Sequence, residues 1–150
     1  MLKLRSKTQR HALKEHELGD LTTNFSKREF ACPCGCKADN ISPWLVQSLQ
    51  DVRDEIEIPM RITSGVRCEM HNAAVGGKAH SAHVPVAQND EHGVVGRAVD
   101  ISCKASRDRH ILLGVLYRHF GRIGLGHDFI HVDQDETKPD NVTWHYYAGE

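Results

Sequence analysis

The spacing of apolar residues along the chain predicts two amphipathic helices. The first helix carries an apolar stripe at helical intervals, formed by Leu45, Leu49, Val52 and Ile56. Ser42 can cap this helix, Pro43 fits its first position, and Pro59 stops it. The second helix is expected to begin at a cap on Ser106 and to continue to about Phe120, with an inner face formed by Ile111, Leu112, Val115, Leu116 and His119.

Short apolar runs elsewhere predict strands, at Met60–Thr63, Ala98–Ser102, Arg122–Leu125, Phe129–Asp133 and Val142–Tyr147. A brief helical stretch is expected near Glu69–Val75, closed by Gly76 and Gly77. Residues 78–95 form a polar loop that contains Gly and His, and so long a loop in a compact domain is usually functional or disordered. This order of elements predicts an α+β fold, with a small antiparallel sheet and helices packed on it.

One domain and a short arm account for the length of the chain. Its 150 residues are enough for a single domain with a sizeable core. Residues 1–23 begin with a highly charged stretch, which predicts a polar N-terminal arm ahead of a domain at 24–150. Near the start of that domain Ser26 and Glu29 have the spacing of a capping box, so a short helical turn is expected there.

Composition and charge exclude several classes of protein. Hydrophobic residues make up 39% of the chain, which argues against wholesale disorder. Lys and Arg number 19 against 20 Asp and Glu, so neither nucleic acid nor an anionic membrane is expected as a partner. No apolar segment has the length of a signal peptide or a membrane span. We expect a protein that is cytoplasmic as synthesised, and a monomer.

The five cysteines are an odd number, which argues against a disulfide framework in a cytosolic chain. Three of them form the run Cys32-Pro33-Cys34-Gly35-Cys36. This run can supply half of a structural zinc site, which Cys68 and Cys103 would have to complete. The alternative is a tight turn with small buried thiols, and we expect the turn.

Histidine is the residue type that points to chemistry. The chain has 11 histidines, and His is the commonest metal ligand. The sequence contains no H-E-x-x-H, G-x-S-x-G or P-loop motif, so those chemistries have no support. Asp100 and His131 each interrupt an apolar strand run, and a buried ionisable group needs a partner or a metal. Further candidates lie in the long loop, at His80, His83 and His92.

Four motifs resemble those of a known family, in this order: Ser64-Gly65-Val66-Arg67, Ser81-Ala82-His83, Gly96-Arg97-Ala98-Val99-Asp100-Ile101 and Asp128-Phe129-Ile130-His131-Val132-Asp133. The family is that of the peptidoglycan-cleaving zinc metallopeptidases (metallopeptidase family fifteen), which includes D-Ala-D-Ala carboxypeptidases and L-alanyl-D-glutamate endopeptidases. The likeness extends from about residue 24 to residue 147, most of the chain. It implies the hedgehog-like zinc fold.

The resemblance implies one catalytic Zn²⁺ ion, with the ligands His83, Asp100 and His131. Asp128 would be the general base that takes the proton of the zinc-bound water. Arg67 would hold a carboxylate or carbonyl of the substrate, and Ser81 would lie beside the substrate. Asp133 is two residues beyond His131 and shares its side of the strand, so it is a candidate for orienting that ligand.

The sequence departs from the family pattern around two of the ligands. Sixteen residues separate His83 from Asp100, more than the family usually has, so His92 is the alternative first ligand. Trp144 and His145 resemble the Trp-His ending of the dipeptidase branch, but the acid that the branch has three residues before this His is absent. His145 is therefore interpreted as a neighbour that lines the site or as plain strand surface.

These observations predict a zinc-dependent peptidase that hydrolyses a peptidoglycan stem-peptide bond involving a D-amino acid, as a carboxypeptidase or an endopeptidase. Such a phage or bacterial wall-lytic enzyme would act on the cell wall after release or as a component of a phage particle. One alternative is a non-catalytic, zinc-stabilised binding module on the same fold, which would not need Asp128. Another is an interaction protein built on a cysteine knuckle.

Overall fold

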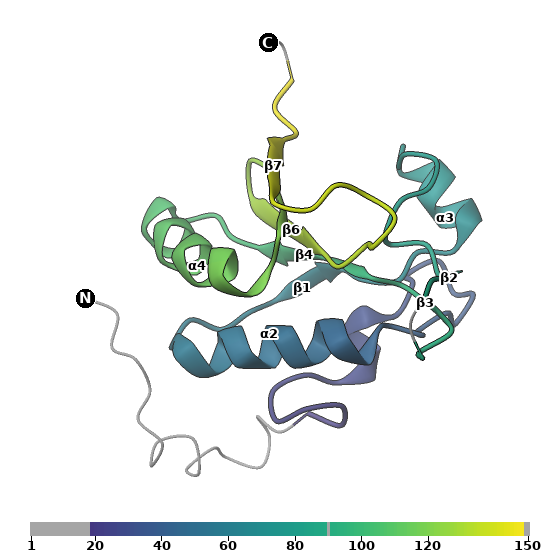
Figure 1. The fold of residues 1–150 in the computed structure, drawn as a ribbon, viewed down its shortest axis with the longest axis horizontal. Coiled ribbons are helices and arrows are strands. Elements are labelled where there is room, and N and C mark those ends of the chain that lie inside the picture. The colour runs from purple at the N-terminus through teal and green to yellow at the C-terminus, as the bar shows by residue number, and fades with distance from the viewer. Residues whose placement is uncertain (1–18, 90, 149–150) are drawn as a thin grey trace.

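A five-stranded sheet organises the part of the chain that the computed structural model describes, residues 19–89 and 91–148 (Figure 1). In spatial order its strands are β1 (Ile62–Ser64), β4 (Ala98–Ser102), β6 (Phe129–Asp133), β5 (Arg122–Leu125) and β7 (Val142–His145). The helices α2 (Pro43–Glu55) and α4 (Ser106–His119) contact each other and share one apolar core with the sheet. This mixed content confirms the predicted α+β class.

The sheet is mixed, whereas the sequence analysis expected an antiparallel one. β4 runs antiparallel to β1 and β6, and β6 antiparallel to β5, but β7 lies parallel to β5 with Val142 opposite Arg122. The reason is the return path of the chain. Because β6 ends beside the start of β5, the connecting residues 134–141 bring β7 to that same end, and β7 then runs in the direction of β5.

Strict alternation along the two central strands separates the core from the opposite face of the sheet. Successive side chains of a strand point to opposite faces. One face of β4 and β6 is apolar and packs into the core through Val99, Ile101, Ile130 and Val132. The other face carries Asp100 and His131, which are direct partners in the register of the two strands. The sheet therefore fixes both polar side chains on the side away from α2 and α4.

Local signals explain where the first helices begin. Ser42 caps α2, since its Oγ accepts a hydrogen bond from a first-turn amide, and Pro43 is the first residue of the helix. Ser26 and Glu29 form the expected capping box at the start of the short 3₁₀ helix η2 (Lys27–Phe30). Both beginnings confirm the sequence analysis.

The two later helices lie where they were expected, with one correction. α3 (Glu69–Ala74) occupies the predicted brief stretch and lies at the opposite end of the molecule from α4 (Figure 1). The predicted cap on Ser106 is wrong, because α4 already contains Ser106 and its N-cap is Ala105. A residue inside the first turn cannot cap the helix from outside, so the α4 terminus lacks a side-chain cap.

The long polar loop is anchored by a buried arginine. It contains two short paired strands, β2 (Val86–Ala87) and β3 (Val94–Val95). Arg97 is only 2% exposed. Its guanidinium donates hydrogen bonds to the carbonyl oxygens of Val86 (2.6 Å), Val95 (3.0 Å) and Gly93 (3.4 Å). These hydrogen bonds tie the long polar loop to the residue just before β4, the strand that carries Asp100.

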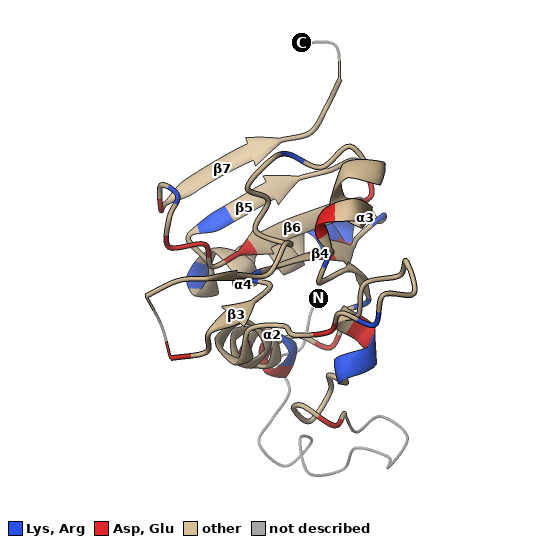
Figure 2. Ribbon diagram, turned by 90° about the vertical axis from the view of Figure 1, so that its right-hand side faces the viewer, with Lys and Arg blue, Asp and Glu red and all other residues tan. Residues whose placement is uncertain are grey.

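Only the end of the predicted N-terminal arm lies within the described residues, since residues 1–18 are outside them. Thr22 Oγ1 and the amide of Asn24 both donate hydrogen bonds of 2.8 Å to Oε1 of Gln50 on α2. Lys and Arg residues are interspersed with Asp and Glu residues along the ribbon in Figure 2. Within the described ranges, every helix is too short or too polar to cross a membrane.

Candidate active site

Three of the predicted ligands meet at one buried point. Asp100 on β4 and His131 on β6 are brought together by the register of the sheet, and His83 reaches them from the loop before β2. Oδ1 of Asp100 lies 2.9 Å from Nδ1 of His131 and 3.3 Å from Nε2 of His83. All three residues are buried. The structure therefore assembles a His-Asp-His cluster from segments far apart in the sequence.

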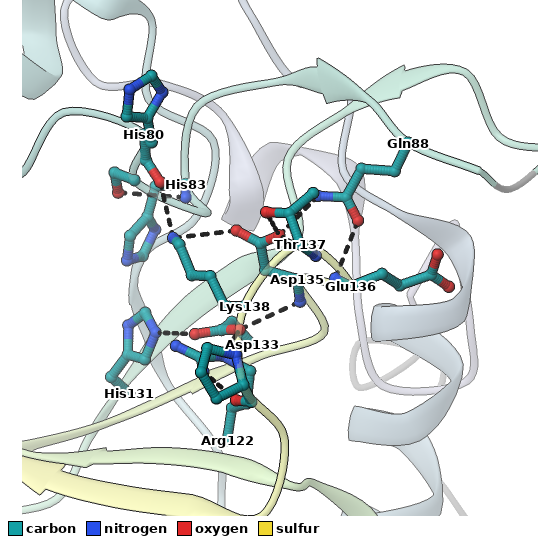
Figure 3. A network of polar contacts seen from close by, with 12 residues as sticks. His80, His83, Gln88, Arg122, His131, Asp133, Asp135, Glu136, Thr137 and Lys138 are labelled. Carbon is teal, nitrogen blue, oxygen red and sulfur yellow. Dashed lines mark hydrogen bonds and ion pairs between the residues drawn. The ribbon is translucent and has the colours of Figure 1, made fainter.

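Each histidine of the cluster is oriented through its other ring nitrogen. Nδ1 of His83 lies 2.7 Å from the carbonyl oxygen of Gly65, and Nε2 of His131 lies 2.8 Å from Oδ2 of Asp133. Figure 3 shows the contact between His131 and Asp133. A carbonyl or a carboxylate fixes the outer nitrogen of most metal-binding histidines in this way. Asp133 thus takes the orienting position that its spacing from His131 indicated.

The cluster fits a metal ion. A carbonyl oxygen only accepts hydrogen bonds, so neutral His83 carries its proton on Nδ1 and turns the lone pair of Nε2 towards Asp100. Both ring nitrogens of His131 face carboxylates, Asp100 at Nδ1 and Asp133 at Nε2, so a cation bound at Nδ1 would leave the proton on Nε2, directed at Asp133. The lone pair of His83 that faces a carboxylate oxygen calls for a cation between the two. Donor atoms about 3.3 Å apart are also what a tetrahedral zinc ion with bonds of about 2.0–2.1 Å requires.

Burial and charge shift the pKa values of the three residues in different directions. Burial lowers the pKa of His83 and outweighs the opposing contact with Asp100. For His131 burial acts in the same direction, but the carboxylates of Asp100 and Asp133 overcome it and raise the pKa. Burial would raise the pKa of Asp100, yet its contacts with the two histidines hold it well below the usual range. Asp100 is therefore ionised throughout the neutral range.

Arg67 and Ser81, the two predicted substrate residues, both line the pocket that contains the cluster. Nη2 of Arg67 is 3.1 Å from Oδ2 of Asp100. This oxygen is the one that does not contact the histidines. Nε of Arg67 donates to Oγ of Ser64 at 2.9 Å. Ser81 Oγ accepts a hydrogen bond from the amide of His83 at 3.3 Å. Both predicted substrate residues thus also support the ligands.

Asp128 does not join the cluster. It lies exposed in the bend before β6, outside the lining of the pocket, and its backbone carbonyl accepts a hydrogen bond from the amide of Cys103. The side of β6 that faces the pocket carries Phe129, His131 and Asp133, since alternate residues share a face. The structure therefore does not place this carboxylate in the lining of the pocket beside the other site residues.

The two alternative histidines lie apart from the cluster. His92 packs against Trp44, with ring centroids 5.2 Å apart, and does not line the pocket. The structure places His83, and not His92, beside Asp100. His145 is exposed and stacks on Tyr147 at 5.0 Å, which corresponds to strand surface.

The cluster forms the floor of a pocket of about 440 Å³. The sequence analysis did not assign several of the residues that line this pocket: Lys78, Arg122, Phe129, Lys138, Trp144 and Tyr146. Phe129 is two residues before His131 and could have been found from the alternation of β6. The rest come from β5, from the edge strand β7 and from loops, whose placement beside the pocket the sequence does not reveal.

A polar network holds the loop after β6 against the long loop (Figure 3). Lys138 Nζ donates to the carbonyl oxygen of His80 at 2.7 Å and lies 3.0 Å from Oδ2 of Asp135. Gln88 donates to Oδ1 of Asp135 at 2.8 Å. Burial would raise the pKa of Asp135, but hydrogen bonds from Thr137 and Lys138 lower it. The network joins the segment that carries His83 to the strand that carries His131.

The cysteines do not follow the expectation of small buried thiols. Cys32 is buried, but Cys34 and Cys36 are exposed, and all three lie beside Cys68. Cys103 is buried in the apolar core, away from them. The described residues therefore contain two clusters that could hold a metal ion, the His-Asp-His cluster and a group of four cysteines.

Comparison with known proteins agrees with the site. No protein with a curated description matches the chain. A family model described as Peptidase M15 matches residues 23–133, a range that contains the whole His-Asp-His cluster. This match supports a metallopeptidase. The chain therefore belongs to the Peptidase M15 family.

Proposed function

We propose that this protein is a zinc-dependent peptidase that cleaves a peptidoglycan stem-peptide bond involving a D-amino acid. The observation that carries the proposal is the convergence of His83, Asp100 and His131 on one buried point at the floor of an open pocket. Zinc held there would polarise the scissile carbonyl and lower the pKa of a bound water towards about 7. The hedgehog-like fold and the action on cell walls belong to the same proposal, and both rest on the resemblance of the motifs.

The chain's own residues hold this centre in a fixed geometry. The carbonyl of Gly65 keeps the proton of His83 on Nδ1, and Asp133 would hold the proton on Nε2 of His131 once an ion is bound at Nδ1. Arg67 occupies the outer oxygen of Asp100, so the inner oxygen stays directed at the histidines. A centre that is organised before the substrate arrives avoids the cost of reorganisation during the reaction.

The lining of the pocket suits a substrate with a free carboxylate. Four cationic residues line it, Arg67, Lys78, Arg122 and Lys138, against two described carboxylates, Asp100 and Asp133. Lys78 is exposed, and no described residue forms an ion pair with its Nζ. Stem peptides that end in D-Ala or contain D-Glu present such carboxylates. Lys78 is thus the cation at the rim that remains available to a substrate.

Tyr146 and Trp144 form the aromatic wall of the pocket. Trp144 lies against His131, with ring centroids 5.4 Å apart. Burial raises the pKa of Tyr146, so its phenol stays protonated at neutral pH. We assign to Tyr146 a hydrogen bond from its hydroxyl to a substrate carbonyl, and to Trp144 an apolar contact with a small side chain such as that of D-Ala.

Two carboxylates compete for the role of proton acceptor. The resemblance assigns the role to Asp128. Among the described residues that line the pocket, however, the carboxylates are Asp100, a predicted ligand, and Asp133. Replacing each by asparagine separates them. A rate loss of about 10²–10⁴-fold at one position, with zinc retained, identifies the general base. If the rate falls only for Asp133→Asn and zinc is lost with it, Asp133 acts solely as the partner of His131.

Mass spectrometry of the soluble products from purified peptidoglycan tests the proposed function. We expect release of D-Ala, or of stem fragments cut beside a D-amino acid, and complete loss of products after treatment with a chelator. Added zinc should restore them. Zinc-loaded protein that releases nothing from walls of several compositions would overturn the enzyme and favour the non-catalytic binding module.

Replacing Lys78 by alanine should raise the KM for a stem peptide about tenfold and change kcat much less. The reason is that Lys78 would bind a carboxylate remote from the scissile bond, and a charged hydrogen bond contributes about 1.5–3 kcal/mol. Steady-state kinetics on a synthetic stem peptide measure both constants. Lys104→Ala is the matched control, because Lys104 is exposed and does not line the pocket. Equal KM values for the two variants would remove Lys78 from the substrate site.

A further inference from the structure

Four cysteine sulfurs meet on the surface of the protein, away from the pocket lining. Sγ of Cys34 lies 3.5 Å from Sγ of Cys32 and 3.5 Å from Sγ of Cys68, and the latter two sulfurs are 3.9 Å apart. Cys36 completes the group, whose ligand atoms all lie within 4.8 Å of one another. Three of these cysteines come from one turn, and the fourth precedes α3. The group therefore joins two segments separated by more than thirty residues.

The spacing of the sulfurs matches a tetrathiolate metal site. In a tetrahedral zinc site with Zn–S bonds of about 2.3 Å, neighbouring sulfurs lie about 3.8 Å apart. The separations of 3.5–3.9 Å agree with this value. They are much longer than a disulfide bond of about 2.05 Å, and all five cysteines of the chain are free. Apolar packing does not explain the group, because Cys34 and Cys36 are exposed.

The backbone around the sulfurs is shaped to present them together. Gly35 and Lys37 adopt left-handed conformations (φ of 88° and 64°), which curl the turn so that its three cysteines face the same point. The amide of Ala38 donates to Sγ of Cys36 at 3.5 Å. The amide of His71 donates to Sγ of Cys68 at 3.3 Å. Amide donors of this kind stabilise the thiolate form that a metal ion requires.

We propose that Cys32, Cys34, Cys36 and Cys68 bind a second zinc ion, with a structural role. Four thiolates fill the tetrahedral coordination sphere, which leaves no position for a substrate or a reactive water. Each thiol gives up its proton when the ion binds. Because Cys68 directly follows Arg67, the ion would also fix the segment from which Arg67 reaches Asp100. This inference does not depend on the proposed peptidase function.

Metal analysis of the purified full chain, prepared under reducing conditions, tests the second site. We expect two zinc ions per chain in the wild type and one in Cys34→Ser. His131→Ala should also keep one, and the double variant should keep none. Cys103→Ala is the matched control and should keep both ions, since Cys103 lies in the core away from the cluster. A wild type that holds one ion, lost in His131→Ala and kept in Cys34→Ser, would overturn the proposal.

Spectroscopy of the wild type tests the same site if the serine variant fails to fold. Cobalt substituted for zinc should show the sulfur-to-metal charge-transfer bands and intense visible bands of a tetrahedral thiolate site. A mercurial reagent should release one zinc ion and leave the other bound, because only one site is held by thiolates. Cobalt spectra without sulfur bands, or a disulfide among these cysteines in the freshly reduced protein, would contradict a tetrathiolate site.

Discussion

Replacing His131 by alanine is expected to remove the metal ion from the pocket and to lower peptidoglycan hydrolysis at least about a thousandfold. A metal ion that polarises the carbonyl and supplies the nucleophile contributes several kcal/mol to the reaction, and each 1.36 kcal/mol is a factor of ten in rate. The substitution also leaves Asp100 and Asp133 without their shared partner in a buried site. Product release and zinc content, measured on the same sample, check both expectations.

His92→Ala is the matched control for this experiment. His92 was the alternative ligand on sequence grounds, but its ring lies against Trp44 and not in the pocket. This variant should keep its pocket zinc and at least about half of its activity. The expectation for His131 fails if His131→Ala retains zinc and rate, or if His92→Ala loses both.

Acid should reverse metal binding at the same centre. Histidine binds a metal through its neutral form, so protons compete with zinc as the pH falls. The carboxylates beside His131 raise its pKa, so this residue gains a proton at a higher pH than an isolated histidine would. Hydrolysis is therefore expected to decline on the acid side in parallel with zinc content. Activity that stays flat down to about pH 4 would contradict a metal held by histidines.

Replacing Arg97 by leucine should lower the free energy of unfolding by about 3 kcal/mol. Arg97 is almost completely buried and donates to three backbone carbonyls of the long loop. Hydrogen bonds from a charged group contribute about 1.5–3 kcal/mol each, and the removal of a buried charge offsets part of their loss. Leucine would fill part of the volume but leave the carbonyls without these donors. Chemical denaturation measures the total loss. Faster hydrogen exchange in residues 84–95 would locate the loss in the loop.

Arg107→Leu serves as the control for Arg97→Leu. Arg107 is exposed in the first turn of α4, and a surface substitution there should change stability by no more than about 0.5 kcal/mol. Two variants with equal stability would show that Arg97 does not anchor the loop. Unchanged exchange in the loop, with a large overall loss, would place the role of Arg97 elsewhere in the core.

The local pattern of apolar and capping residues predicted most of the helices and strands, because the form of each depends mainly on residues close together in the sequence. The bounds of β4, β5 and β6 were predicted to the residue, and Ser42 and Pro43 marked the beginning of α2. The features that were not predicted depend on contacts between residues far apart in the sequence. The parallel placement of β7 depends on where β6 ends, and the two-residue strands β2 and β3 are too short to show a period.

The same division applies to the sites. Asp100 and His131 stood out because a polar residue interrupts an apolar strand in each case, and the sheet places them together as register partners. Lys78 and Lys138 lie on loops that carry no periodic signal, so the sequence did not place them at the pocket. The contact between Cys32 and Cys68 joins segments that only the folded chain brings together.

The pairing of Asp100 with His131 has a consequence for folding. A slip of one residue between β4 and β6 would turn one strand's whole set of side chains to the wrong face, so the carboxylate and the imidazole would lie on opposite sides of the sheet. A misaligned chain could not assemble the ligand set, and an ion that binds only the native state stabilises only that state. An ion bound in the pocket would therefore favour correct strand alignment, and chains that fold in its presence are expected to populate the one register that can hold it.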